Sequence, residues 1–231
     1  MTDAHCHVSC GDPGIREFLI GRDFVGVHPW ESLGGLESLG GLESWLRDKL
    51  TNPNVPNSEA SNLLPGIGEI GLDRLKEREI SPQMREVFEV QLKLAFEFNR
   101  PVVLHGAKCW GQVVKTIQTF QTSQTFQTSQ TFLFHGFSRS DGLIPDIVAL
   151  NGYISVGPAV LNDHAVNYRA LVKRIPLERL LLETDRTPEN AAECPSVAAV
   201  AAAVAELRGV SVAELERLTD ENAERFRCRY S

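Results

Sequence analysis

Short apolar runs alternate along the chain with longer stretches that carry the spacing of amphipathic helices. The runs lie at 24–28, 63–69, 101–105, 131–135, 153–156 and 180–185. Runs of this kind suit strands that are buried on both faces, as in a parallel sheet. Strands that alternate with helices indicate βα units. We therefore predict an α/β fold, a (β/α)8 TIM-like barrel that takes up residues 1–231 as a single domain.

Three helices are indicated by periodicity together with their end signals. A stretch at 83–99 follows Ser81 and Pro82, which are residue types that favour the N-cap and the first helical position. Its apolar residues form one broad stripe, as expected of a helix that covers a sheet. A stretch rich in Ala and Val at 196–208 and another at 212–226 predict two further helices.

The beginning of the chain breaks the regular alternation. Apolar runs at 15–20 and 24–28 could both be strands, but only residues 21–23 separate them. A parallel crossover needs roughly a dozen residues. Either this segment is a hairpin-like excursion, or one run is not a barrel strand. We therefore expect the barrel to be irregular near its first three strands.

Two tandem repeats interrupt the connecting segments. The sequence SLGGLE occurs at 32–37 and again at 38–43, and FQTSQT occurs at 120–125 and again at 126–131. Two copies are too few for a repeat architecture, so we interpret both as small duplications in surface connections. In the second repeat, Phe120, Phe126 and Phe132 would share one face of a strand. A helix extension or a surface hairpin are the alternatives.

Composition places the chain among ordinary globular proteins, with 42% hydrophobic and 23% charged residues. The net charge of −7 argues against a protein that coats nucleic acid by bulk charge. Five scattered cysteines predict reduced thiols. We find no export signal and no run near the ~20 apolar residues that span a bilayer. The expectation is a cytoplasmic protein without a membrane or an obligate protein partner.

Six residues suited to metal binding recur at comparable places. Residues two apart in a strand point the same way, so a His-x-His pair near the N-terminus can grip one ion. The other four close or follow later apolar runs, and the carboxyl ends of parallel barrel strands meet on one face. The set is His5, His7, Glu69, His105, His135 and Asp185. Buried carboxylates repel one another unless cations offset their charge.

Imidazole with carboxylate suits zinc, manganese, nickel or iron, and magnesium less well. Six ligands exceed one tetrahedral site with an open position. Two divalent ions with one bridging carboxylate match the set better, and such a pair activates water against a phosphate ester.

Several longer motifs resemble the TatD family of metal-dependent deoxyribonucleases, which belongs to the amidohydrolase-like barrel superfamily. The motifs follow the family's order over nearly the whole chain. They are DAHCH at 3–7, GVHPW at 26–30, GEIGLD at 68–73, PVVLH at 101–105, HGFS at 135–138, YISVG at 153–157, ETD at 183–185 and TDENAERF at 219–226. The GEIGLD and ETD blocks are distinctive individually.

The resemblance implies an eight-stranded barrel that hydrolyses phosphodiesters with divalent metal. It implies that one ion is bound by His5, His7 and Asp185 and the other by His105 and His135. Glu69 would bridge the two ions. Asp185 would also take the proton of the attacking water.

Further motif residues would support this centre or the fold. The resemblance places His28 and Glu183 behind the ligands or in the substrate pocket. Asp73, Asn222 and Phe226 are expected to be structural. Trp30 has an indole that can stack on a base, but we expect it to pack in the core.

The surroundings of the metal ligands depart from the family pattern. Ala107 stands where the family usually has Arg, with Lys108 following, and Arg139 and Arg186 replace Gly and Ala. Each of the three cations is either a phosphate contact or a solvated surface charge. The segment between His7 and His28 is also shorter than usual.

Three functions therefore stay open at this stage. The leading hypothesis is a dinuclear hydrolase of DNA or small phosphodiesters. The second is an amidohydrolase-type enzyme that cleaves an amide or ester with the same cluster. The third is a non-catalytic metal-binding protein, which would be expected to lack one of the six ligands.

Overall fold

The computed structural model describes residues 1–31, 33, 35–52, 64–76, 78–123 and 130–227. The strands in these ranges are β1 (Thr2–Cys6), β2 (Arg16–Leu19), β3 (Phe24–Val25), β4 (Gly66–Asp73), β5 (Val102–Ala107), β6 (Phe132–Phe134), β7 (Gly152–Val156) and β8 (Leu180–Leu182). The α-helices are α1 (Leu39–Thr51), α2 (Pro82–Glu97), α3 (Trp110–Ser123), α4 (Ile144–Ala149), α5 (Val166–Arg174), α6 (Val197–Arg208) and α7 (Val212–Arg227). From β3 onward strands and helices alternate, as predicted.

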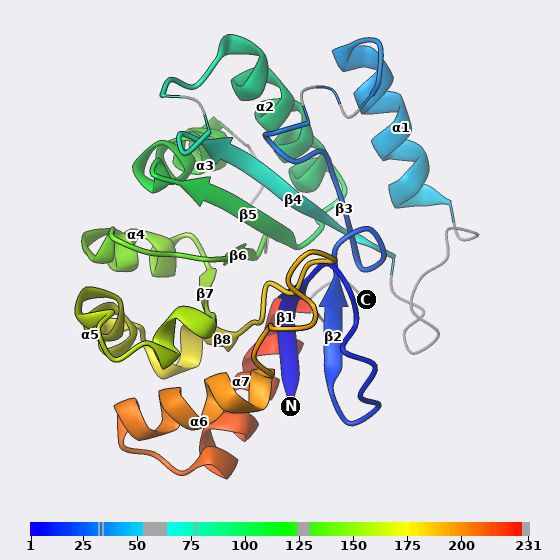
Figure 1. The fold of residues 1–231 in the computed structure, drawn as a ribbon. Coiled ribbons are helices and arrows are strands. Elements are labelled where there is room, and N and C mark those ends of the chain that lie inside the picture. The colour runs from blue at the N-terminus through cyan, green and yellow to red at the C-terminus, as the bar shows by residue number, and fades with distance from the viewer. Residues whose placement is uncertain (32, 34, 53–63, 77, 124–129, 228–231) are drawn as a thin grey trace.

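All strand pairings are parallel, and the strands follow one another in chain order. Strands β3 to β8 form one sheet, and β1 with β2 forms a separate pair (Figure 1). Backbone bonds connect the pair to the end of β8, because Asp185 N donates to His5 O at 3.0 Å and His7 N to Arg186 O at 2.8 Å. A parallel bridge between Ile20 and Phe24 connects it to β3. This ring order is the one that the predicted TIM-like barrel requires.

The expected irregularity lies at the first three strands. Both apolar runs contain a strand, but β2 pairs with β1 whereas β3 belongs to the six-stranded sheet, and the two do not form a hairpin. Their parallel contact is limited to the Ile20–Phe24 bridge. Because the two strands do not lie side by side along their length, no helical crossover is needed between them.

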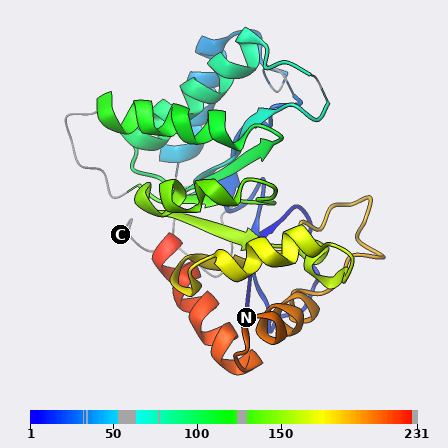
Figure 2. The same ribbon diagram turned by 90° about the vertical axis from the view of Figure 1, so that its left-hand side faces the viewer.

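Local end signals place the predicted helices correctly. Ser81 caps α2 by accepting a hydrogen bond from Met84 N, with Pro82 as the first helical residue. Ser196 caps α6 in the same way, and the helix ends at Gly209, whose φ of +67° suits glycine. Helices α3, α4 and α5 lie in chain order from top to bottom on one flank (Figure 2).

Two hydrophobic clusters separate the barrel wall from its interior. Along β5, Val102 and Leu104 pack into the large cluster shared with the helices, whereas Val103 belongs to a smaller one. The smaller cluster takes one residue from each of seven strands and is completed by Phe226 and Ala223 of α7. The end of α7 thus closes the barrel interior, and the structural role predicted for Phe226 is confirmed.

The described residues of the two repeats lie at helix ends and in the connections beside them. Ser38 of the second SLGGLE copy caps α1 by accepting from Gly41 N. The first FQTSQT copy starts within α3, whereas Phe132 lies in β6, so the shared strand face is wrong for Phe120 and Phe132. Phe126 lies outside the described residues. Phe120 and Phe132 both contact Phe96, with ring centroids 6.2 and 6.1 Å away.

The described residues bear on the state of the cysteines and on the presence of membrane-spanning helices. Cys6, Cys10, Cys109 and Cys194 are all free thiols, and Cys228 lies outside the described part of the chain. Within that part, none of the helices combines the length and apolar character needed to cross a bilayer.

Candidate metal centre

Strand alternation directs several of the predicted residues into the barrel. Val103 and Leu133 point into the interior cluster, and His105 and His135 lie two positions later in the chain. Residues two apart share a face of a strand, so both imidazoles point inward above that cluster. Glu183 lies two positions after Leu181, which belongs to the same interior cluster, so its side chain also points inward. The inner core therefore forms the floor on which the polar residues gather.

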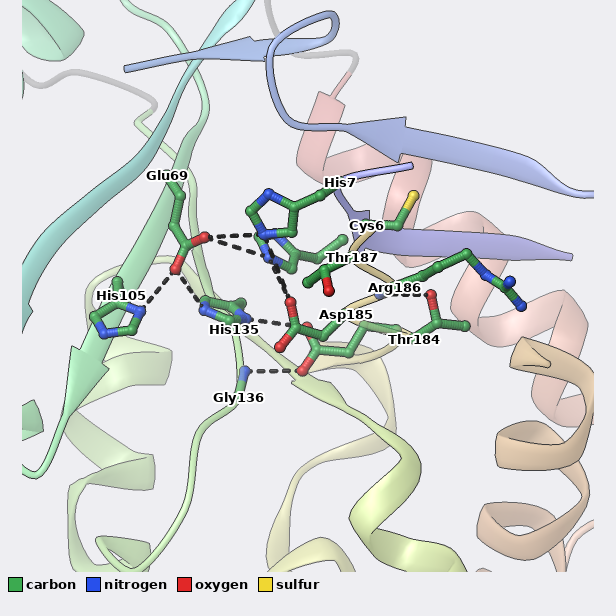
Figure 3. A network of polar contacts seen from close by, with 12 residues as sticks. Cys6, His7, Glu69, His105, His135, Gly136, Thr184, Asp185, Arg186 and Thr187 are labelled. Atoms are coloured by element: carbon green, nitrogen blue, oxygen red, sulfur yellow. Dashed lines mark hydrogen bonds and ion pairs between the residues drawn. The ribbon is translucent and has the colours of Figure 1, made fainter. Parts of the chain in front are cut away.

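Glu69 does not lie at a strand end, as the sequence suggested, but in the middle of β4. The pairing of β4 with β5 changes register between Ile67 and Ile70, so the regular ladder is broken at this carboxylate. The Glu69 side chain is buried, and Figure 3 shows it at the centre of the polar network. Its two oxygens face different sets of histidines.

The first set surrounds Glu69 Oε2. His5 Nε2 and His7 Nε2 each lie 3.5 Å from this oxygen. The same two nitrogens lie 3.4 and 3.6 Å from Asp185 Oδ1. Four atoms from distant parts of the chain thus face a common point.

These donors fit a divalent cation. Zinc binds nitrogen and oxygen at about 2.0–2.2 Å, which in a tetrahedral site separates the ligand atoms by roughly 3.3–3.6 Å. The four separations lie in this range. His5 Nε2 is buried and has no hydrogen-bond partner, although it faces two carboxylates. A buried nitrogen without a partner is costly, and a cation bound by these four atoms would satisfy it.

The second set surrounds Glu69 Oε1. His105 Nδ1 and His135 Nε2 each lie 2.7 Å from this oxygen (Figure 3). The atom types suit a cation, but this spacing is that of direct hydrogen bonds. The ring of His135 also stacks on that of His5, with centroids 4.0 Å apart, so the two donor sets adjoin.

Glu69 and the histidines perturb each other's protonation. Burial alone would raise the pKa of Glu69, but the charge of His135 and hydrogen bonds from His105 and His135 hold that pKa well below its usual value. Burial opposes charge on His135, yet the Glu69 carboxylate raises the His135 pKa well above its usual value. A hydrogen bond between His7 and Glu69 raises the pKa of His7. Without a cation, protonated imidazole therefore balances the buried carboxylate.

Asp185 stands at the open side of the centre. Its side chain is 48% exposed, whereas that of Glu69 is 4% exposed. Its backbone is left-handed, with φ of 50°, a conformation that is uncommon outside glycine and often found at functional sites. Burial would raise the pKa of Asp185, but the nearby His5 imidazole and the charge of His135 lower it, so the carboxylate is ionised.

Two further predicted residues lie directly behind the first six. Glu183 accepts hydrogen bonds from Gly136 N at 2.8 Å and Ser155 Oγ at 2.5 Å, and lies 3.7 Å from His135 Nδ1. His28 Nδ1 accepts the backbone N–H of Trp30 at 3.2 Å. A neutral His28 therefore carries its proton on Nε2, which lies 3.5 Å from Glu69 Oε1.

The three cations that depart from the family pattern differ in their surroundings. Lys108 is exposed on the turn after β5 and makes no polar contact with the other predicted site residues of the described chain. Arg186 turns into its own loop, where it donates to Ala191 O and Cys194 O. Arg139 lines a cleft of about 1060 Å³ that starts at the metal-ligand side of β8.

Two roles assigned from the sequence need correction. Asp73 was expected to be merely structural, but its Oδ2 lies 2.7 Å from His105 Nε2, on the ring edge opposite Glu69. The sequence signal for this role was its spacing, because Asp73 lies four residues after Glu69 and residues at even spacing share one face of a strand. Trp30 was expected in the core, yet it is 49% exposed beside His28. Asn222, in contrast, is structural as predicted, because its amide donates to Leu177 O and Leu180 O.

Comparison with known proteins agrees with this geometry. A family model described as TatD related DNase matches residues 22–227. An uncharacterized metal-dependent hydrolase of Bacillus subtilis, YabD, is 31% identical over 219 residues, which cover 92% of this chain and 79% of that protein. A human protein named deoxyribonuclease TATDN3 is 27% identical over 209 residues, covering 86% and 71% of the two chains.

A solved structure supports the fold. The TatD homologue YjjV of Escherichia coli superposes with a TM-score of 0.73 at 22% identity, covering 98% of this chain and 97% of that one. The fold is therefore that of a TatD-type TIM barrel, as predicted. By the extent of the family match and the likeness to YabD, the chain belongs to the TatD family of metal-dependent hydrolases.

Proposed function

We propose that this protein is a metal-dependent phosphodiesterase that acts on DNA or on a small nucleotidic phosphodiester. The observation that carries the proposal is the division of Glu69 between two donor sets. Its Oε2 faces His5 and His7, and its Oε1 faces His105 and His135. A carboxylate placed in this way can bridge two cations.

The proposed cofactor is a pair of divalent ions. His5, His7, Asp185 and Glu69 would hold the first, and His105 and His135 would share Glu69 for the second. The abundance of imidazole favours zinc, manganese or nickel over magnesium. When bound, such a pair lowers the pKa of a water and offsets charge on both the attacking and leaving oxygens of a phosphate ester.

The protein's own side chains would perform the remaining steps. Asp185, ionised and exposed, is placed to accept the proton of the attacking water as a general base. His28, whose Nε2 lies 3.5 Å from Glu69 Oε1 and 3.4 Å from His105 Nδ1, would contact a substrate phosphate oxygen beside the centre. Glu183 would hold His135 in orientation through its Nδ1 edge, as partners of metal-binding histidines do.

Named relatives support this substrate class. One relative is called a deoxyribonuclease. Another, from Edwardsiella piscicida, is called a 3'-5' ssDNA/RNA exonuclease, and it is 28% identical over 120 residues, which cover 52% of this chain and 44% of that protein. The retention of all six predicted ligands disfavours a non-catalytic protein.

The test combines metal analysis with hydrolysis assays. We expect up to two divalent ions per chain, and cleavage of single-stranded DNA and of thymidine 5'-p-nitrophenyl phosphate that a chelator abolishes. Asp185→Asn should lower kcat by about 10²- to 10⁴-fold, because it removes the base. Asp163→Asn is the matched control, since Asp163 is 87% exposed. The proposal would be overturned if the protein hydrolysed amides or carboxylic esters but cleaved no phosphodiester with any of the metals.

A further inference from the structure

Trp30 is the aromatic residue that the core does not explain. It lies on the turn after β3 and is 49% exposed, whereas Trp110 is 4% exposed. Its ring centroid is 4.9 Å from that of His28 and 6.1 Å from that of His105. A large apolar surface is thus left in water at the edge of the metal centre, where burial would otherwise stabilise the fold.

The backbone fixes this ring beside the centre. Trp30 N–H donates to His28 Nδ1, and Glu31 N–H donates to His28 O at 2.9 Å, so the turn is closed on His28. The indole meets both imidazoles at steep angles, 77° to His28 and 71° to His105. The ring is therefore held by its neighbours without being covered by them.

A positive charge accompanies the exposed ring. Lys76 Nζ lies over one face of the Trp30 ring, 5.3 Å from its centroid, which leaves a base to stack on the other face. An aromatic surface next to a cation is the arrangement by which proteins hold single-stranded nucleic acid, because the base stacks and the cation attracts the phosphates. A simple phosphodiester without a base would gain nothing from the ring.

We propose that Trp30 is a stacking platform for the nucleobase adjoining the phosphate at the metal centre. The inference rests on the proposed phosphodiesterase function and narrows its substrate to phosphodiesters that carry an unpaired base. Trp30 would then determine specificity, and it would take no part in the bond cleavage itself. Lys76 would contribute to the affinity for the backbone.

The test compares two substrates that differ only in their bases. One is an oligothymidylate, and the other is an oligomer of the same length built from abasic tetrahydrofuran units. We expect the wild-type protein to prefer oligothymidylate in kcat/KM by about 5- to 150-fold. Trp30→Ala should lose this preference, because kcat/KM should fall much further for oligothymidylate than for the abasic oligomer. Trp30→Phe should keep most of the preference.

The outcomes separate specificity from a structural role. Val212→Ala, at an exposed position on α7, is the control and should behave as wild type. Equal losses on both substrates in Trp30→Ala would show that the ring only supports the centre, and would overturn the inference. So would a wild-type protein that cleaves the two oligomers equally well.

A binding measurement keeps the inference testable apart from turnover. Phosphorothioate oligothymidylate should quench the emission of Trp30 in the zinc-loaded protein, and the abasic analogue should not. The Trp30→Phe variant shows whether the quenched emission comes from Trp30, because Trp45 and Trp110 are still present in it. Absence of cleavage of both oligomers and of thymidine 5'-p-nitrophenyl phosphate would refute the proposed function, whereas absence of base-dependent quenching would refute the platform.

Discussion

Asp73→Asn tests how the centre sets the orientation of one histidine. Asp73 Oδ1 accepts the N–H groups of Leu75 and Lys76 at 2.6 and 2.9 Å, and Oδ2 lies 2.7 Å from His105 Nε2. An asparagine would keep its oxygen on the two backbone donors, since the reversed amide would place donors against donors. Its NH₂ group would then face Nε2, which must become an acceptor.

The consequence falls on the opposite nitrogen of the ring. With Nε2 as acceptor, the proton of a neutral His105 lies on Nδ1, the atom 2.7 Å from Glu69. A protonated nitrogen cannot bind a cation. Loss of such an orienting partner costs about 10- to 100-fold in metal affinity, or about 1.4–2.7 kcal/mol. The metal-free protein should lose less, about 0.5–1.5 kcal/mol of unfolding free energy, because two hydrogen bonds remain.

Zinc titration by calorimetry and counting of bound ions measure the effect. We expect weaker binding at the second position only, with the first position unchanged. Nitrogen-15 spectra of the zinc-loaded proteins should show the His105 proton on Nε2 in the wild type and on Nδ1 in the variant. Asp163→Asn controls for the loss of one charge. If Asp73→Asn binds both ions with wild-type affinity, Asp73 does not set the tautomer and the reasoning is wrong.

Two further predictions concern stability. Phe226→Ala should cost about 3–5 kcal/mol of unfolding free energy, because it empties the buried plug of the barrel interior. In urea denaturation, the exposed Val212→Ala should cost about 0.5 kcal/mol of unfolding free energy or less. Similar losses for Phe226→Ala and Val212→Ala would contradict the view that Phe226 fills the barrel interior. Free zinc about a hundred-fold above its Kd should stabilise the fold by about 2.7 kcal/mol. Thermal melts that do not change with chelator would argue against a preformed cation site.

The sequence was sufficient where the signal is local. Ser81 with Pro82 and Ser196 placed two helix starts, because an N-cap depends on neighbouring residues alone. Apolar runs located strands β2 to β8, and the two-residue spacing of His5 and His7 indicated that these side chains point the same way. The six proposed ligands could be chosen from their spacing and from their places in or after apolar runs, because a parallel barrel brings its strand ends to one side; Glu69 departs from this rule by lying within β4.

Tertiary structure decided whatever depends on the distance between separate segments. Glu69 lies in mid-strand, where the pairing of β4 with β5 changes register, and no local pattern indicates this change. The bond between Asp73 and His105 forms only when β4 and β5 pair. Trp30 is of a residue type that usually packs in a core. It is exposed in the structure, where its backbone N–H is bonded to His28 in the turn after β3. Periodicity reports which face a residue occupies, whereas contact and solvent exposure depend on the partners that other parts of the chain supply.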